Sequence, residues 1–183
     1  QLLLQLAEKL ALEGLGCETV VASMGEWLNY ITYHKVYEER RKLGENFALN
    51  SLLKKIDYQN VKQLLKYALT LRYQYGAMDR AYNAVSALGI RRDHHIGHLF
   101  ENLGDLYHLD LVGEAALSIA SGVTAEKEGF DGVANVYPFG CMPSTNALII
   151  LRKYYAKLAE RNGGVGFPFV NVSCDDANRP TRF

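Results

Sequence analysis

The order of apolar and polar positions predicts alternating helices and strands at the two ends of the chain. Leucines near the start recur at helical intervals, so residues 1–13 are expected to form a helix that Gly14 and Gly16 end. The apolar and β-branched run at 17–22 predicts a short buried strand. A helix, a tight glycine turn and a strand together make up half of an α/β repeat.

A long stretch with helical spacing follows this first strand. Ser23 can cap a helix that starts near Glu26, and Gly44 is expected to interrupt that helix. Further helical segments are expected to begin at these places: Asn50, Asp57, residue 80 and residue 95. We therefore interpret residues 24–110 as a mainly helical insertion between strands.

The last third of the chain gives the clearest pattern. Its predicted elements are, in order, a helix rich in small residues at 111–128, a strand at 132–137, a helix at 144–161 and a strand at 167–173. Two strands that are joined through one helix by short loops are expected to lie parallel. The predicted fold class is therefore α/β, with a small parallel sheet flanked by helices (a Rossmann-like half) and a helix-rich insertion. Residues 1–183 are expected to form one such domain or part of one.

Composition and charge exclude several classes of protein. Of the 183 residues, 49% are hydrophobic, which is too many for a disordered chain, and no apolar stretch reaches the roughly 20 residues of a membrane span. Twenty basic residues balance 20 acidic ones, so no global positive field favours nucleic acid. The basic run at 40–42 follows Glu38 and Glu39, which predicts a solvated helix face with ion pairs between successive turns.

The ends and the cysteines of the sequence indicate its setting. It opens at Gln1, without a methionine and inside a helical pattern, so we expect it to be part of a longer polypeptide. No signal peptide precedes the cysteines, and three scattered cysteines are too few for a disulfide framework. A cytoplasmic, reducing location is the resulting expectation.

The loop between the last predicted strand–helix pair carries the strongest chemical signal. Cys141 lies in the loop 138–143, where free backbone N–H groups and the helix dipole favour a thiolate. Gly140 lets the backbone approach a ligand closely, and Ser144 can donate a hydrogen bond to a bound group or cap the helix. Such a thiolate suits metal coordination or nucleophilic attack, whereas a buried cysteine that packs as a small hydrophobe is the alternative.

This loop resembles a segment of the 2-hydroxyacyl-CoA dehydratase superfamily. The stretch 131–143 is similar to the dehydratase-like region of the large proteins named CoA-substrate-specific enzyme activases. Three other stretches are similar to segments of the same family, namely 15–28, 112–117 and 167–182. The resemblance covers residues 12–45 and 110–183 and leaves the middle of the chain unassigned.

The resemblance implies a stacked α/β architecture and a [4Fe–4S] cluster held by cysteine thiolates. Cys141 is the position carried over as a candidate cluster ligand, with Gly140 and Ser144 beside it in the cofactor-binding loop. A cubane cluster needs about three or four thiolates, and only Cys141 matches the family pattern. Other ligands are therefore expected outside this sequence, and no cluster is expected to bind this chain alone. Nothing in the sequence resembles the phosphate loops of an ATPase, so an ATP-hydrolysing activase is expected as a separate module or protein.

Other candidate residues have plainer explanations. Cys17, in a predicted strand, is expected to pack in the core, and Cys174 lies at the same predicted sheet edge as Cys141. His94 and His98 have the spacing of two zinc ligands on a helix, but surface histidines are the favoured interpretation. The acidic pair at 175–176 is another candidate, and a hydrated turn is the favoured interpretation. Two arginines of the tail, Arg179 and Arg182, could contact a CoA phosphate.

The function expected from the resemblance is that of an iron–sulfur, dehydratase-like component linked to an ATP-dependent activase. It would act in anaerobic metabolism, either in electron transfer to an acyl-CoA or in radical dehydration or reduction of that acyl-CoA. The chain alone would be catalytically silent. Acyl-CoA and a second copy in a homodimer are further partners to consider. The alternative is a non-catalytic interaction or regulatory domain that kept the fold and lost the cluster. A cysteine nucleophile with a histidine base is a third hypothesis.

Overall fold

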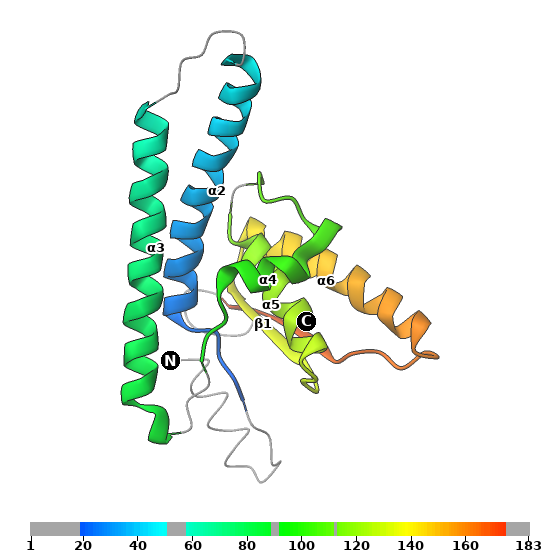
Figure 1. Cartoon of the computed structure of the whole chain (residues 1–183). Helices are drawn as coiled ribbons and strands as arrows, with labels where there is room; N and C mark the ends of the chain where they lie inside the picture. The colour runs from blue at the N-terminus through cyan, green and yellow to red at the C-terminus, as the bar shows by residue number, and fades with distance from the viewer. Residues whose placement is uncertain (1–18, 51–57, 89–91, 112, 175–183) are drawn as a thin grey trace. The chain divides into compact units, whose positions relative to one another are not determined.

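The computed structural model describes residues 19–50, 58–88, 92–111 and 113–174. The chain divides into two compact units, which Figure 1 colours by position along the sequence. We call residues 22–96 the hairpin unit. The other unit, which combines residues 1–21 with 97–183, is called the α/β unit.

The hairpin unit consists mainly of two long helices, α2 (Met24–Asn50) and α3 (Tyr58–Ala84), which lie side by side (Figure 1). A short 3-10 helix, η1 (Ser86–Leu88), follows them. The predicted cap at Ser23 is confirmed, since its Oγ accepts a hydrogen bond from the backbone N–H of Glu26 at 3.2 Å. Among the described helices, none combines the length and the apolar composition that crossing a bilayer requires.

The expected interruption at Gly44 is wrong, because α2 continues through it to Asn50. One glycine inside a helix lowers its stability by about 1 kcal/mol, and tertiary packing outweighs a penalty of this size. The helix expected near residue 80 is the end of α3 followed by η1. The segment expected to begin near Asn50 falls on residues 51–57, outside the described residues.

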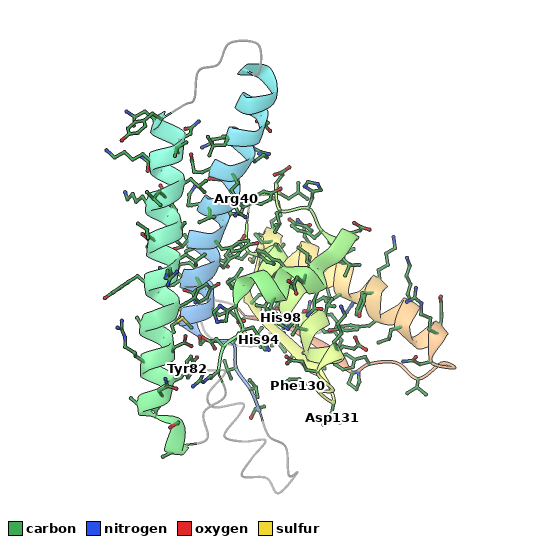
Figure 2. All side chains as sticks on the ribbon, viewed as in Figure 1. Arg40, Tyr82, His94, His98, Phe130 and Asp131 are labelled. Atoms are coloured by element: carbon green, nitrogen blue, oxygen red, sulfur yellow. The ribbon has the colours of Figure 1, made fainter. Side chains whose placement is uncertain are left out.

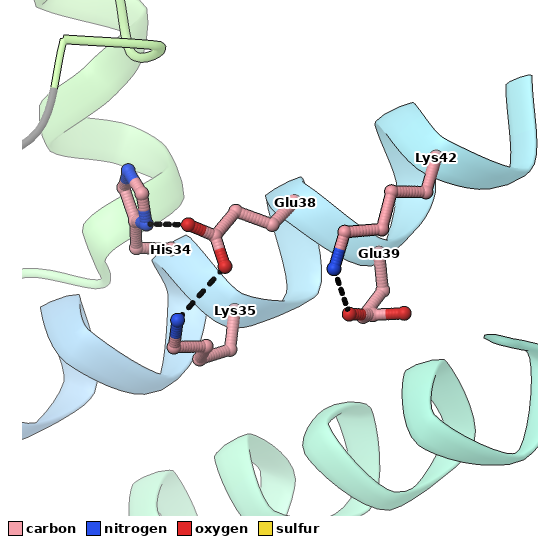
Figure 3. Close-up of polar contacts among 5 residues, drawn as sticks. All are labelled: His34, Lys35, Glu38, Glu39 and Lys42. Carbon is pink, nitrogen blue, oxygen red and sulfur yellow. Dashed lines mark hydrogen bonds and ion pairs between the residues drawn. The ribbon is translucent and has the colours of Figure 1, made fainter. Parts of the chain in front are cut away.

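Ion pairs follow α2, as its charge pattern predicts (Figure 3). Lys35 Nζ lies 2.8 Å from Glu38 Oε2, and Lys42 Nζ lies 2.7 Å from Glu39 Oε1. His34 Nδ1 lies 3.4 Å from the other carboxylate oxygen of Glu38. The expectation of a wholly solvated face is wrong at Glu39, which is buried and has an Oε2 atom without a hydrogen-bond partner.

The α/β unit contains the remaining described elements. These are α4 (Ile96–Leu103), η2 (Gly104–Leu106), α5 (Ala115–Lys127), β1 (Val133–Pro138), α6 (Met142–Arg161) and β2 (Phe169–Cys174). The helix expected to begin near residue 95 is α4 followed by η2. The other four elements were predicted, with boundaries shifted by a few residues. A small α/β fold is therefore confirmed for this part of the chain.

Close packing of α5 against α6 forms the core of the α/β unit. A Cβ atom on Gly122 would lie 2.9 Å from both terminal methyl groups of Leu151, so the small residue permits the approach of the two helices. The hydroxyl of Tyr155 donates a hydrogen bond to the Gly122 carbonyl at 2.9 Å. Almost wholly buried neighbours include Ile119 and Val123. The predicted helix rich in small residues is therefore the one that packs closely against α6.

Strands β1 and β2 pair in parallel, as predicted, with Val133 opposite Phe169 and Pro138 opposite Cys174. Side chains reinforce the register, since Asn135 Nδ2 donates to Asn171 Oδ1 at 3.0 Å. Helix α6 connects the two strands along the chain. Their carboxyl ends therefore meet at one edge of the sheet.

The strand expected at 17–22 is wrong where the structure describes it. Residues 19–22 have no strand assignment, and Val20 and Val21 are 46% and 44% exposed. Residues 17 and 18 lie outside the described residues. β-branched residues favour a strand only where a neighbouring strand and a buried face accept them, and the described sheet has only β1 and β2.

Candidate functional site

The candidate site is the sheet edge at which β1 and β2 end. Pro138 and Cys174, the last residues of the two strands, are direct partners in the register. The backbone N–H of Phe139 donates to the Cys174 carbonyl at 2.6 Å, which extends the pairing by one residue. Ligands of open α/β sheets bind at such carboxyl ends. The parallel pairing therefore supports the prediction that the loop 138–143 lies at the edge where a ligand would bind.

A tight turn leads the chain from β1 into α6. Gly140 has a φ of 78°, in the left-handed region that favours glycine, and nothing lies within 4 Å of the place a Cβ would take. The N–H of Cys141 donates to the Pro138 carbonyl at 3.2 Å and closes the turn. Gly140 therefore serves the backbone conformation, and the space above it is open.

Cys141 is the N-cap residue of α6. Its backbone is extended (φ −70°, ψ 104°), and its carbonyl accepts from the Thr145 N–H at 3.1 Å and from Thr145 Oγ1 at 3.0 Å. Its side chain makes no capping hydrogen bond, and the free thiol is half-buried. The structure thus places the sulfur at the strand-to-helix joint, as predicted.

Ser144 contacts the sulfur directly. Its hydroxyl lies 3.1 Å from Cys141 Sγ and donates a hydrogen bond to it. The sequence left open whether Ser144 caps the helix or donates to a bound group; in the structure its bond is to the thiol. Ser144 and Cys141 therefore form one polar pair at the start of α6.

Segments that are distant in the sequence meet at this loop. Pro143, in the first turn of α6, lacks the N–H that would have no helical partner there. A Cβ on Gly113 would lie 3.1 Å from Pro143 Cγ, and Gly113 has a φ of 121°. The segment at Gly113 and the cysteine loop are thus in contact.

The second thiol of this edge belongs to Cys174. It is half-buried and free, and it ends β2 next to the turn that leads to Cys141. The tail candidates are the acidic pair 175–176, Arg179 and Arg182, and all of them lie outside the described residues, as does Cys17. The described part of the edge therefore offers two sulfur atoms, and the Ser144 hydroxyl is hydrogen-bonded to one of them.

The histidine pair expected as a weak zinc candidate does not lie on one helix. Helix α4 begins at Ile96, so His94 precedes it and only His98 is helical. His98 Nδ1 lies 3.5 Å from Glu101 Oε2 on an exposed helix surface. In the described ranges no group of three or more His, Cys, Asp or Glu side chains is arranged to hold a metal ion.

A buried carboxyl group in the hairpin unit was not foreseen as a titratable site. Glu26 is only 5% exposed, and burial, together with the nearby charge of Asp93, raises its pKa from 4.5 to about 7. Ser23 links the two acids, since its hydroxyl donates to Asp93 and its Oγ accepts from the Glu26 N–H. The sequence indicated only that Glu26 suits a helix start, because its burial depends on Asp93, far along the chain.

Chemically, the sheet edge offers soft sulfur donors with a hydroxyl hydrogen bond at one of them. Thiolates coordinate iron and other soft metals and attack electrophiles. The aromatic ring of Phe139, 74% exposed, stands beside the turn. The described geometry suits a ligand that approaches the open side of the Gly140 turn.

Comparisons with protein-family models, with curated proteins and with solved structures found no match for this chain. The site is therefore interpreted from its own residues and from the resemblance of its loop.

Proposed function

We propose that this chain is part of an iron–sulfur, dehydratase-like component that works with an ATP-hydrolysing activase. It acts in electron transfer to an acyl-CoA substrate or in radical dehydration or reduction of that substrate, in a reducing cytoplasm. The α/β unit is the Rossmann-like half that presents the ligand loop. The single observation that carries the proposal is the position of Cys141, at the N-cap of α6 on the carboxyl edge of the parallel sheet.

The thiols of the described chain fit part of a cluster. Cys141 is the proposed ligand, and Cys174 ends the neighbouring strand at the same edge. A [4Fe–4S] cluster takes about three or four thiolate ligands, so the two thiols at the described part of this edge do not complete the set. The proposal therefore requires further ligands from other parts of the protein or from a partner.

The chain's own residues have defined parts in this proposal. The cluster supplies one-electron chemistry when it is bound. Ser144 donates a hydrogen bond to the sulfur of Cys141, and such bonds to ligand sulfurs tune an iron–sulfur centre. Gly140 keeps the backbone of the turn open toward the ligand. Pro143 packs on the segment at Gly113 and fixes the loop in place.

A second candidate function is a non-catalytic interaction or regulatory domain that has lost the cluster. The observation that favours it is the donor count, because the described residues bring no third metal-binding side chain to the two thiols. In that case Cys141 is a reduced thiol without a metal. The two candidates differ in whether removal of this sulfur changes the metal content.

Anaerobic reconstitution with iron and sulfide tests the proposal. We expect the chain, reconstituted together with the parts that supply the remaining ligands, to retain both elements, and its Cys141→Ser variant to lose most of them, because one anchoring ligand is gone. Cys17→Ser is the matched control, since it removes one of the three thiols from a segment remote in sequence from the loop. Equal iron and sulfide in the wild type and in Cys141→Ser contradicts the ligand assignment. A wild-type protein that stays metal-free with the activase and with the parts that supply the remaining ligands favours the interaction domain.

A further inference from the structure

Helix α3 presents a row of bulky apolar side chains to solvent. Its members are Tyr58, Val61, Leu65, Leu69 and Tyr73, which are 74%, 40%, 58%, 58% and 70% exposed. We call these five residues the α3 outer face. From position 61 onward they recur every four residues, so they follow one side of the helix. No described residue of α3 is buried.

The outer face points away from α2. The opposite side of α3 contacts α2 through Met78, whose sulfur lies 2.8 Å from Asn29 Nδ2. At 100° of rotation per residue, Met78 lies roughly 160° around the helix from the middle of the outer face. Figure 2 shows side chains along α3 that extend from the side opposite α2.

Positive charge accompanies this apolar row. Lys62, Lys66 and Arg72 lie within or beside it by helical spacing, and α3 contains no Asp or Glu before Asp79. Two carboxylates of α2, Glu38 and Glu39, already pair with lysines of their own helix. The outer face therefore combines exposed apolar groups with cations that the described chain does not neutralise.

Gly76 continues the same side of α3 by one turn. Nothing lies within 4 Å of the place a Cβ would take, so no neighbour in this chain requires a glycine there. A glycine inside a helix costs about 0.5–1 kcal/mol relative to alanine. A residue without a side chain at this place allows the backbone of another helix to approach closely.

We propose that the α3 outer face binds an amphipathic, acidic helix of a partner protein. The valine and the two leucines of the outer face would pack against the apolar side of the partner helix. Lys62, Lys66 and Arg72 would pair with the carboxylates of that helix. A second copy of this chain fits less well, because it would bring the same cations to the contact. A lipid surface also fits less well, because Lys62 and Arg72 interrupt the apolar row instead of lying on an opposite polar face.

A designed peptide pair tests the proposal with the full chain. The probe is a fluorescein-labelled synthetic helix about three heptads long, with leucine at a and d and glutamate at e and g. Its counterpart carries lysine in place of glutamate. We expect fluorescence anisotropy to show binding of the acidic peptide at least about tenfold tighter than binding of the basic one. Charge reversal by Lys62→Glu with Lys66→Glu should invert this preference.

Matched variants separate binding from folding. Leu65→Ser with Leu69→Ser should weaken binding of the acidic peptide by about tenfold or more, whereas Ile149→Ser on α6, 60% exposed, should leave it unchanged. Gly76→Ala should weaken binding and Gly44→Ala should not, although both glycines have open space around them. Circular dichroism at equal concentration checks that every variant keeps its helices.

Three results would overturn the proposal. The first is equal binding, or no binding, of the two peptides. The second is that the chain sediments with anionic phosphatidylglycerol vesicles but does not bind the acidic peptide, and that the two leucine substitutions abolish this sedimentation. The third is a concentration-dependent dimer in sedimentation velocity that the same substitutions abolish, because the face would then serve a second copy.

Discussion

In the α/β unit the almost wholly buried side chains are chiefly aliphatic or small, such as Ile119, Val123 and Leu151, whereas several in the hairpin unit are polar. The hairpin unit buries Glu26 and Asn29 and leaves a row of apolar residues on α3 in solvent. Burial of apolar surface stabilises a fold at any pH. A buried carboxyl group, in contrast, is destabilising once it loses its proton, because burial disfavours the charged form. The two units should therefore respond differently to cavities, to pH and to added methyl groups.

The largest expected effect is a cavity in the α/β unit. Leu151→Ala should lower the free energy of unfolding by about 2–5 kcal/mol, because Leu151 is 1% exposed and packs against Gly122. Urea denaturation followed by circular dichroism measures the loss. Ile149→Ala on the same helix is the control, since its side chain is 60% exposed and should change stability by less than about 0.5 kcal/mol.

The second prediction concerns the pH dependence of the hairpin unit. The folded state holds the Glu26 proton up to about pH 7, whereas the unfolded chain releases it near 4.5. The stabilisation from this group is therefore complete below about 4.5, declines as the pH rises to about 7 and is absent above it. The total loss is on the order of 3 kcal/mol. The fluorescence of Trp27, the one tryptophan of the chain, reports on this unit during urea denaturation.

Two substitutions isolate that contribution. Glu26→Gln should remove the decline between about pH 4.5 and 7 and make the variant more stable than wild type at neutral pH. Glu38→Gln is the control with the opposite sign, because the hydrogen bond from Lys35 lowers the pKa of Glu38, so this carboxylate loses its contribution as the pH falls. An unchanged slope in Glu26→Gln would show that Glu26 does not retain its proton.

The smallest expected effects come from adding one methyl group to a helix of each unit. Gly122→Ala should destabilise the α/β unit by about 1 kcal/mol, because overpacking against Leu151 exceeds the gain in helix propensity. Gly76→Ala should stabilise the hairpin unit by about 0.5–1 kcal/mol, because the added methyl group meets open space. Thermal unfolding of both variants beside wild type measures the two signs, and equal signs would contradict the comparison.

The parts of the fold that follow from local pattern could be predicted from the sequence. The parallel pairing of β1 and β2 follows from two short strands and one connecting helix. The N-cap of α2, Ser23, also acts through a neighbouring residue, since its Oγ accepts from the N–H of Glu26. The cap acts within a few residues, and the strand pairing follows from a short strand–helix–strand connection, so a single sequence carries both.

The features that depend on distant contacts could not be predicted. A strand at 17–22 fits the β propensity of its residues, yet Val20 and Val21 are exposed in the structure. The raised pKa of Glu26 depends on burial and on Asp93, a residue of another segment. At the candidate site, the place of Cys141 could be predicted, but its hydrogen bond from Ser144 and the contact between Gly113 and Pro143 required the folded chain.

The central claim is that the sulfur of Cys141 binds iron, and alkylation of the cysteines measures it directly. The chain, together with the parts that supply the remaining ligands, is treated with iodoacetamide before and after anaerobic loading with iron and sulfide. Each cysteine is then followed by peptide mass spectrometry. Our account predicts that Cys141 reacts in the metal-free protein and is protected after loading, while the reactivity of Cys17 does not change. Alkylation of Cys141 at the same rate before and after loading would contradict it.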